Sequence, residues 1–159
     1  MENLESYVDL KGQVISLAGL DAEEHDLLAT IIRKAESKPG WDEFTNEWRA
    51  AVASFYDARG VSRQESRRRA VYRVAQDLAG RMAIAEGKAR APDYRDELDR
   101  LIRERFPTRR AFCEATGLSE DMLSHVLARR KHLAIDTLAE ALDRIGVDVR
   151  LVPREPANV

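Results

Sequence analysis

The spacing of apolar residues constrains the fold of this chain more than any other feature of its sequence. Apolar side chains recur every three or four positions in most segments, which places them on one face of an α-helix. Glycine and proline interrupt this pattern repeatedly, and both residues favour turns over helices. The sequence therefore predicts an all-α fold built from short helices. The interruptions fall at Pro39-Gly40, Gly60, Gly87, Pro107 and Gly146.

Residues 1–90 are expected to form a helical domain. The start of the chain is ambiguous, because residues 4–17 combine apolar spacing with Gly12. Ser62 and Glu65 form a Ser-x-x-Glu capping box, in which side chains satisfy free backbone N–H groups at a helix start. The helices expected in this domain cover residues 21–38, 42–58 and 62–86.

Residues 91–159 are expected to form a second domain, which begins at the joint Ala91-Pro92. It contains five short elements, of which the first four are helices. The last is a strand, because apolar and polar residues alternate from Val147 to Val152. The expected elements cover residues 93–106, 108–115, 119–128, 135–145 and 147–152.

Two of these helices are joined by a turn of a few residues that contains glycine, which is the pattern of a helix-turn-helix. The residues that carry the pattern are Phe112, Cys113 and Thr116, then Gly117-Leu118-Ser119, then Leu123, Ser124 and Val126, then Leu133 to Leu138 and Leu142 to Val147. Together and in this order they resemble the phage-repressor family, also called Cro-like or XRE-type. The resemblance covers about residues 94–150 and implies a transcriptional regulator that binds DNA.

The resemblance implies that the second helix of the pair enters the major groove of double-stranded DNA. Its base-facing positions would be Ser119, Glu120, Asp121, Ser124 and His125. The positions that contact phosphate would be Arg109, at the start of the first helix, and Arg129, Arg130 and Lys131, after the second.

Two acidic residues depart from the family's pattern, which often has neutral or basic side chains at these positions. Glu120 and Asp121 can accept hydrogen bonds from cytosine N4 and can therefore read a base. They can equally serve only to stabilise the start of the helix, where the helix dipole favours negative charge. The sequence leaves both interpretations open.

The net charge of the chain is −2, so a DNA-binding function has to rest on local charge. Residues 1–61 hold six basic and twelve acidic residues, whereas residues 62–90 hold eight basic and three acidic ones. Arg67, Arg68 and Arg69 lie in the basic segment, and we expect them to be solvated or to pair with the acidic first segment. Residues 129–131 have a comparable alternative, which is solvated charge at the C-terminus of a helix.

Several classes of protein are not expected. Cys113 is the single cysteine, so the chain forms no internal disulfide and fits a reducing cytoplasm, where we expect this thiol to be packed and inert. The histidines and this cysteine lack metal-ligand spacing, and no catalytic motif is present, so we expect no metal, no cofactor and no enzymatic activity. No apolar run is long enough for a membrane span, and the acidic start lacks the features of a signal peptide.

The sequence therefore predicts a cytoplasmic, sequence-specific transcriptional regulator that binds double-stranded DNA as a homodimer. The first domain would serve dimerisation or the binding of a partner or effector. One alternative is an antitoxin that autoregulates its operon and also binds a protein toxin. Another alternative is a helix-turn-helix module that binds other proteins and does not bind DNA.

Overall fold

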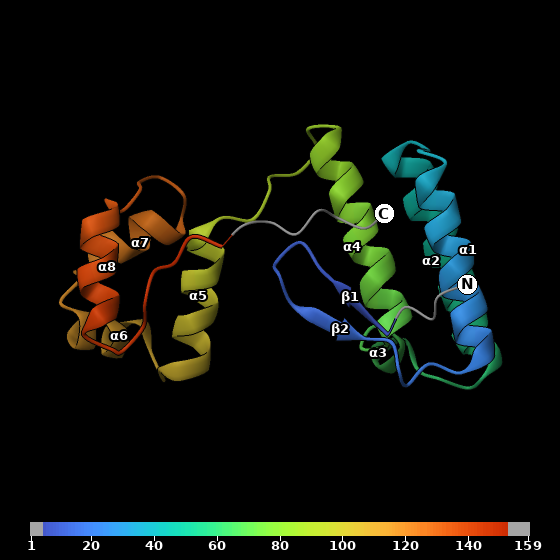
Figure 1. Ribbon diagram of the computed structural model, residues 1–159, viewed down its shortest axis with the longest axis horizontal. Coiled ribbons are helices and arrows are strands. Elements are labelled where there is room, and N and C mark those ends of the chain that lie inside the picture. Colours follow the sequence, from blue (N-terminus) through green and yellow to red (C-terminus); the bar gives the residue numbers. More distant parts are fainter. Residues whose placement is uncertain (1–4, 153–159) are drawn as a thin grey trace. The chain divides into compact units, whose positions relative to one another are not determined.

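The structure is a computed structural model that describes residues 5–152 (Figure 1). The predicted domain limits at residues 1 and 159 therefore lie outside the described residues. The described part contains eight helices and one two-stranded sheet, so the expected all-α class fits in outline. The chain divides into two compact units, Met1–Ala91 and Pro92–Val159, which are described separately below. None of the helices within residues 5–152 is long and apolar enough to cross a membrane.

The first unit begins with a β-hairpin, where the sequence pattern was ambiguous. Strands β1 (Ser6–Val8) and β2 (Val14–Ser16) pair antiparallel, with Tyr7 opposite Ile15. Gly12 has a φ of +74°, so it supplies the left-handed backbone of the hairpin turn and does not interrupt a helix. The expected helical first domain therefore also contains strands at the start that the sequence left ambiguous, because a short window of apolar residues does not distinguish a strand from a helix.

Four helices complete the first unit. They are α1 (Ala22–Glu36), α2 (Trp41–Ala58), α3 (Arg63–Ser66) and α4 (Ala70–Ala85). The helices α1, α2 and α4 pack on one another, and α4 also packs on β2. Their shared core buries Ile15, Leu17, Leu28, Ile31, Phe44, Trp48, Val52, Tyr56, Val71, Val74, Ala75, Leu78 and Ala79.

The single helix predicted over residues 62–86 was wrong, because the helix breaks at residues 67–69. Ser62 does cap a helix start, since its hydroxyl accepts a hydrogen bond from the Glu65 N–H at 3.2 Å, but it caps only the single turn of α3. The break consists of Arg67, Arg68 and Arg69, so no apolar side chain of this segment packs in the core. Packing of an apolar face is the main source of helix stability in proteins, so nothing holds this segment in the helix.

The second unit consists of four helices, α5 (Tyr94–Arg105), α6 (Arg109–Thr116), α7 (Glu120–Leu127) and α8 (Ile135–Asp143). Helix α7 packs on α5 and α6, and α6 packs on α8. Their core buries Leu98, Ile102, Phe112, Cys113, Leu123, Val126, Leu138 and Leu142. The helix limits agree with those expected from the sequence to within one or two residues.

The strand predicted from Val147 to Val152 is absent, because the described residues of this segment form neither a helix nor a strand. Leu151 is 95% exposed and Val152 is 81% exposed, so the alternating apolar residues do not cover a core. A strand needs a partner for its backbone N–H and C=O groups. Within residues 92–152 the second unit offers no partner strand, because the only paired strands described are β1 and β2.

Candidate nucleic-acid interface

The first helix of the pair, α6, begins and ends at residues that its sequence specifies. The Thr108 hydroxyl accepts a hydrogen bond from the Ala111 N–H at 3.1 Å, which caps the helix start. At the other end, Gly117 adopts a φ of +77° and its N–H donates to the Cys113 carbonyl at 2.8 Å. A side chain at this position would also overlap the Arg144 guanidinium, whose Nη1 donates to the Thr116 carbonyl at 3.3 Å. The positive φ therefore favours glycine at this turn, and any larger residue would also displace the end of the Arg144 side chain.

The second helix, α7, is held against the first by a buried apolar face. The Ser119 hydroxyl accepts from the Met122 N–H at 3.1 Å and so fixes the start of the helix. Leu123 and Val126 are almost completely buried, and so is Phe112 of α6. The Phe112 ring also contacts Phe106 edge-on, with ring centroids 5.4 Å apart. These contacts make α6, the turn and α7 one packed unit.

The predicted base-facing residues lie on the outer surface of this helix pair. Ser119, Glu120, Asp121 and Ser124 are exposed, and His125 is half-buried. His125 Nε2 lies 3.6 Å from Asp121 Oδ1, one helical turn away. Ser119 caps the helix and the other four lie on α7 outside its buried face, so together they offer hydroxyl, carboxylate and imidazole groups at the surface.

The predicted phosphate-contacting residues differ in their exposure and in whether they form ion pairs within the chain. Arg130 and Lys131 are exposed after the end of α7, and neither side chain forms an ion pair within the described part of the chain. The Arg109 side chain is 56% exposed and lies 3.4 Å from Asp99. These three cations are accessible to an anionic partner.

Arg129 differs from its neighbours because two carboxylates of the second unit hold it. Its Nη1 is 2.9 Å from Asp93 Oδ2, and its Nη2 is 2.6 Å from Asp96 Oδ2. Its backbone adopts a φ of +62°, which is uncommon for a residue other than glycine. Arg129 thus joins the end of α7 to the start of α5, a structural task that the sequence did not reveal. Its contact with phosphate stays a prediction.

The electrostatics of this cluster explain why it is held together. Hydrogen bonds from Arg95, together with the charges of Arg129 and Arg95, keep the pKa of Asp93 well below its ordinary value, although desolvation opposes this. Desolvation also acts to raise the pKa of Asp96, but it is outweighed by the Asp93 N–H and by Arg129, so that pKa is lowered too. Both carboxylates therefore stay ionised beside the guanidinium. No local signal predicts this arrangement, because Arg129 lies 36 residues from Asp93 and 33 residues from Asp96.

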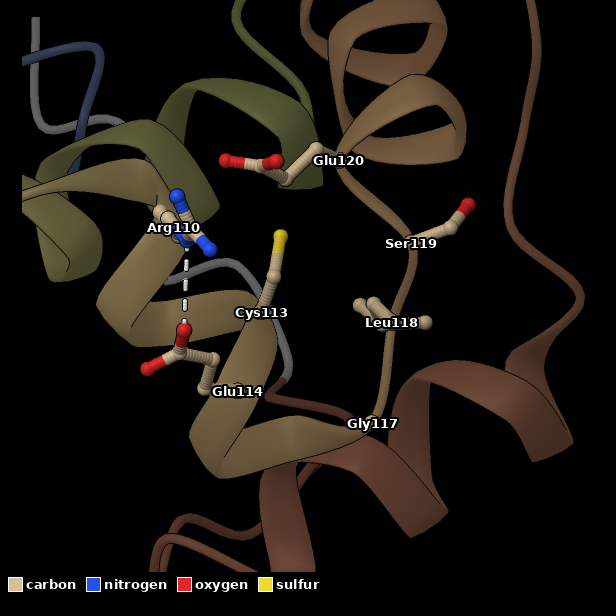
Figure 2. Close-up of a pocket in the computed structure, with 7 residues that line it drawn as sticks. All are labelled: Arg110, Cys113, Glu114, Gly117, Leu118, Ser119 and Glu120. Atoms are coloured by element: carbon tan, nitrogen blue, oxygen red, sulfur yellow. Dashed lines mark hydrogen bonds and ion pairs between the residues drawn. The ribbon is translucent and has the colours of Figure 1, made fainter.

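A shallow hollow lies where α6 meets the start of α7 (Figure 2). Its volume is about 370 Å³, and it is lined by Arg110, Cys113, Glu114, Gly117, Leu118, Ser119 and Glu120. Arg110 and Glu114 form an ion pair of 3.2 Å at its side. The Cys113 sulfur points towards the start of α7, and burial, with a smaller contribution from the charge of Glu120, raises the pKa of the thiol. A raised pKa disfavours the reactive thiolate. Residues 5–152 contain no cluster of three or more side chains suited to bind a metal ion.

Comparison of the chain with protein-family models, with curated proteins and with solved structures found no match.

Proposed function

We propose that this protein is a sequence-specific DNA-binding transcriptional regulator whose α7 enters the major groove. The observation that carries the proposal is the division of α7 into two faces. Leu123 and Val126 fix the helix to its partner, and the polar residues on the opposite side are left exposed. The major groove is wide enough to admit such a helix, and polar side chains at its N-terminal turn can hydrogen-bond to base edges.

The exposed cations beside α7 support the same function. Arg130 and Lys131 follow the helix directly and have no ion pair among residues 5–152, so phosphate oxygens would compete with no internal carboxylate for them. Contacts to phosphate set the position of a protein on the duplex, whereas contacts to bases set its sequence preference. In this proposal, Arg109, Arg130 and Lys131 supply the first kind of contact. Ser119, Glu120, Asp121, Ser124 and His125 supply the second.

The proposal includes a homodimer. A single small DNA-binding module buries only about 600–1,000 Å² of protein surface on DNA, whereas larger interfaces accompany tight and selective binding. Two copies related by two-fold symmetry would read two half-sites about one helical turn apart. Each copy would then place one α7 in the major groove.

Salt dependence of binding tests the phosphate contacts. DNA selected from a random-sequence pool by the full chain serves as the probe, and fluorescence anisotropy gives the affinity at several salt concentrations. Arg130→Ala should lower the slope of log K against log salt by about 0.9, because the variant neutralises one phosphate fewer. Arg150→Ala removes an exposed arginine that already pairs with Asp148, and it is the matched control, expected to leave the slope unchanged. Equal slopes for Arg130→Ala and the unmodified chain would contradict the assignment.

Sequence preference tests the carboxylates on α7. If Glu120 and Asp121 read bases, Glu120→Gln and Asp121→Asn should each reduce the preference for selected DNA over scrambled DNA by about 1–3 kcal/mol. If the acids only stabilise the helix start and repel phosphate, the same substitutions should tighten binding to both DNAs equally. Uniform tightening would therefore refute base reading by these residues.

A protein-binding module without DNA binding is the second candidate. It is favoured by the exposed carboxylates at the start of α7 and by the engagement of Arg129 with two internal carboxylates. Both features lower the positive charge that faces a partner of α7. Absence of any DNA binding by the full chain at low salt, with the fold intact, would select this candidate.

A further inference from the structure

The first unit carries a basic surface that the proposed function does not use. The segment from residue 63 to residue 73 contains five arginines and only one acidic residue, Glu65. Arg69 pairs with Glu65 at 2.6 Å. The other four are exposed, and their side chains form no ion pair or hydrogen bond within residues 5–152. These four, Arg63, Arg67, Arg68 and Arg73, are called the arginine cluster below.

The acidic residues of the first unit do not neutralise the arginine cluster, although the sequence made this an expected outcome. Several carboxylates of the neighbouring elements are engaged with other partners. Asp21 and Glu23 pair with Arg59, Glu24 accepts from the buried Tyr56 hydroxyl at 2.8 Å, and Asp77 pairs with Arg81 at 2.8 Å. The charge of the cluster is therefore available to a partner outside the chain.

The four arginines lie close together along the chain, in α3, in the break after it and at the start of α4. Arg67 N–H donates to the Arg63 carbonyl at 3.3 Å, so these residues lie one above the other on a helical turn. Arg68 follows in the break after α3, and Arg73 lies in the first turn of α4. The start of α4 has no side-chain cap, so the positive end of its dipole adds to the same potential.

We propose that the arginine cluster is a second DNA-binding surface, which contacts the phosphate backbone of the duplex without reading its sequence. Arginine suits phosphate because its planar guanidinium donates two parallel hydrogen bonds and stays charged. Among residues 63–73 the only exposed side chains besides arginine are Gln64 and Glu65, and Glu65 is already paired, which gives little means to distinguish bases. The choice of DNA as the polyanion rests on the function proposed for α7.

Two surfaces on one chain would act together. Residues 86–93 connect α4 of the first unit to α5 of the second, so binding of α7 to a duplex would raise the effective concentration of the arginine cluster near the same DNA. The cluster would then add affinity and salt dependence without changing the preferred sequence.

A charge-removal experiment on the full chain tests this inference. The cluster variant carries Arg63→Gln, Arg67→Gln and Arg68→Gln. The matched control carries Lys11→Gln, Arg33→Gln and Arg49→Gln, which removes the same charge from exposed positions of the same unit. The probe is a mixed-sequence duplex of about three helical turns, and its affinity is measured between roughly 50 and 200 mM salt. The cluster variant should lower the slope of log K against log salt by about 0.9 for each phosphate that it no longer neutralises, up to about 2.7.

The control should leave the slope unchanged, and thermal unfolding of the cluster variant should match that of the unmodified chain. An unchanged slope for the cluster variant would overturn the inference, and so would an equal decrease in both variants, which indicates only the general field of the unit. Arg130→Ala in the same assay separates the two proposals. If Arg130→Ala has no effect and the cluster variant no longer binds, the role of α7 fails and the arginine cluster stands. Binding of the cluster to phosphatidylserine vesicles but not to the duplex would also overturn it.

Discussion

The turn between α6 and α7 offers a quantitative test of how the helix pair is built. Replacing Gly117 by alanine adds a side chain where φ is +77°. A residue other than glycine in this left-handed region costs roughly 1–2 kcal/mol. The new Cβ also overlaps the Arg144 guanidinium, which has to move away and give up its hydrogen bond to the Thr116 carbonyl. Such a bond contributes about 0.5–1.5 kcal/mol, so the total decrease in unfolding free energy should be about 1.5–3.5 kcal/mol.

Gly146→Ala is the matched control, because Gly146 has a φ of +71° in the same unit but no atom within 4 Å of the added Cβ. Its unfolding free energy should decrease only by the backbone part, roughly 1–2 kcal/mol. Far-ultraviolet circular dichroism during thermal unfolding gives the measurement. A decrease of about 1 kcal/mol lowers the Tm of a domain of this size by about 4–8 °C, so Gly117→Ala should lower it by about 6–28 °C.

Both tryptophans, Trp41 and Trp48, lie in the first unit, so tryptophan fluorescence follows that unit alone. We expect Gly117→Ala to shift the dichroism transition of the second unit and to leave the fluorescence transition in place. Equal destabilisation by Gly117→Ala and Gly146→Ala would refute the role of Arg144 at the turn. A fluorescence transition that moves with the dichroism would refute independent unfolding of the two units.

Two further predictions concern pH and assembly. Asp93 and Asp96 have pKa values held below the ordinary value of 3.8, so they stabilise the folded state above that pH, and this contribution is lost as the pH falls through their folded pKa values. The Tm measured by circular dichroism should therefore fall less steeply below about pH 4 in Asp93→Asn than in the unmodified chain, and equal steepness would contradict the assignment. For assembly, sedimentation equilibrium at roughly tens of micromolar protein should give a homodimer, and a monomer would remove that part of the proposal.

Local chemistry explains which parts of the fold could be predicted from the sequence. Thr108 and Ser119 accept hydrogen bonds from N–H groups three residues ahead, and Gly117 adopts a positive φ. Each of these roles depends only on a residue and its immediate neighbours. The limits of α6 and α7 were therefore predictable, and with them the exposed face of α7.

The errors arose where distant residues decide the structure. The hairpin of β1 and β2 is held by Asp77 of α4, which accepts a hydrogen bond from the Tyr7 hydroxyl at 2.7 Å across a separation of 70 residues. The pairing of Arg129 with Asp93 spans 36 residues. The alternating residues from Val147 form no strand because no partner strand is described in their unit. In each case the local pattern permits several outcomes, and only tertiary contacts select one.

Charge pairing, more than charge number, decides which partners this chain can bind. Its net charge of −2 argues against a polyanionic partner, because a chain that binds DNA through its overall charge would be basic. The structure changes that argument, because carboxylates such as Asp21, Asp77 and Asp93 are held by arginines of their own unit. Arg67, Arg68 and Arg130 have no such partner among residues 5–152. In the proposed complex these unpaired cations would contact phosphate, whereas charges that are paired within the chain contribute little beyond the screening length of salt.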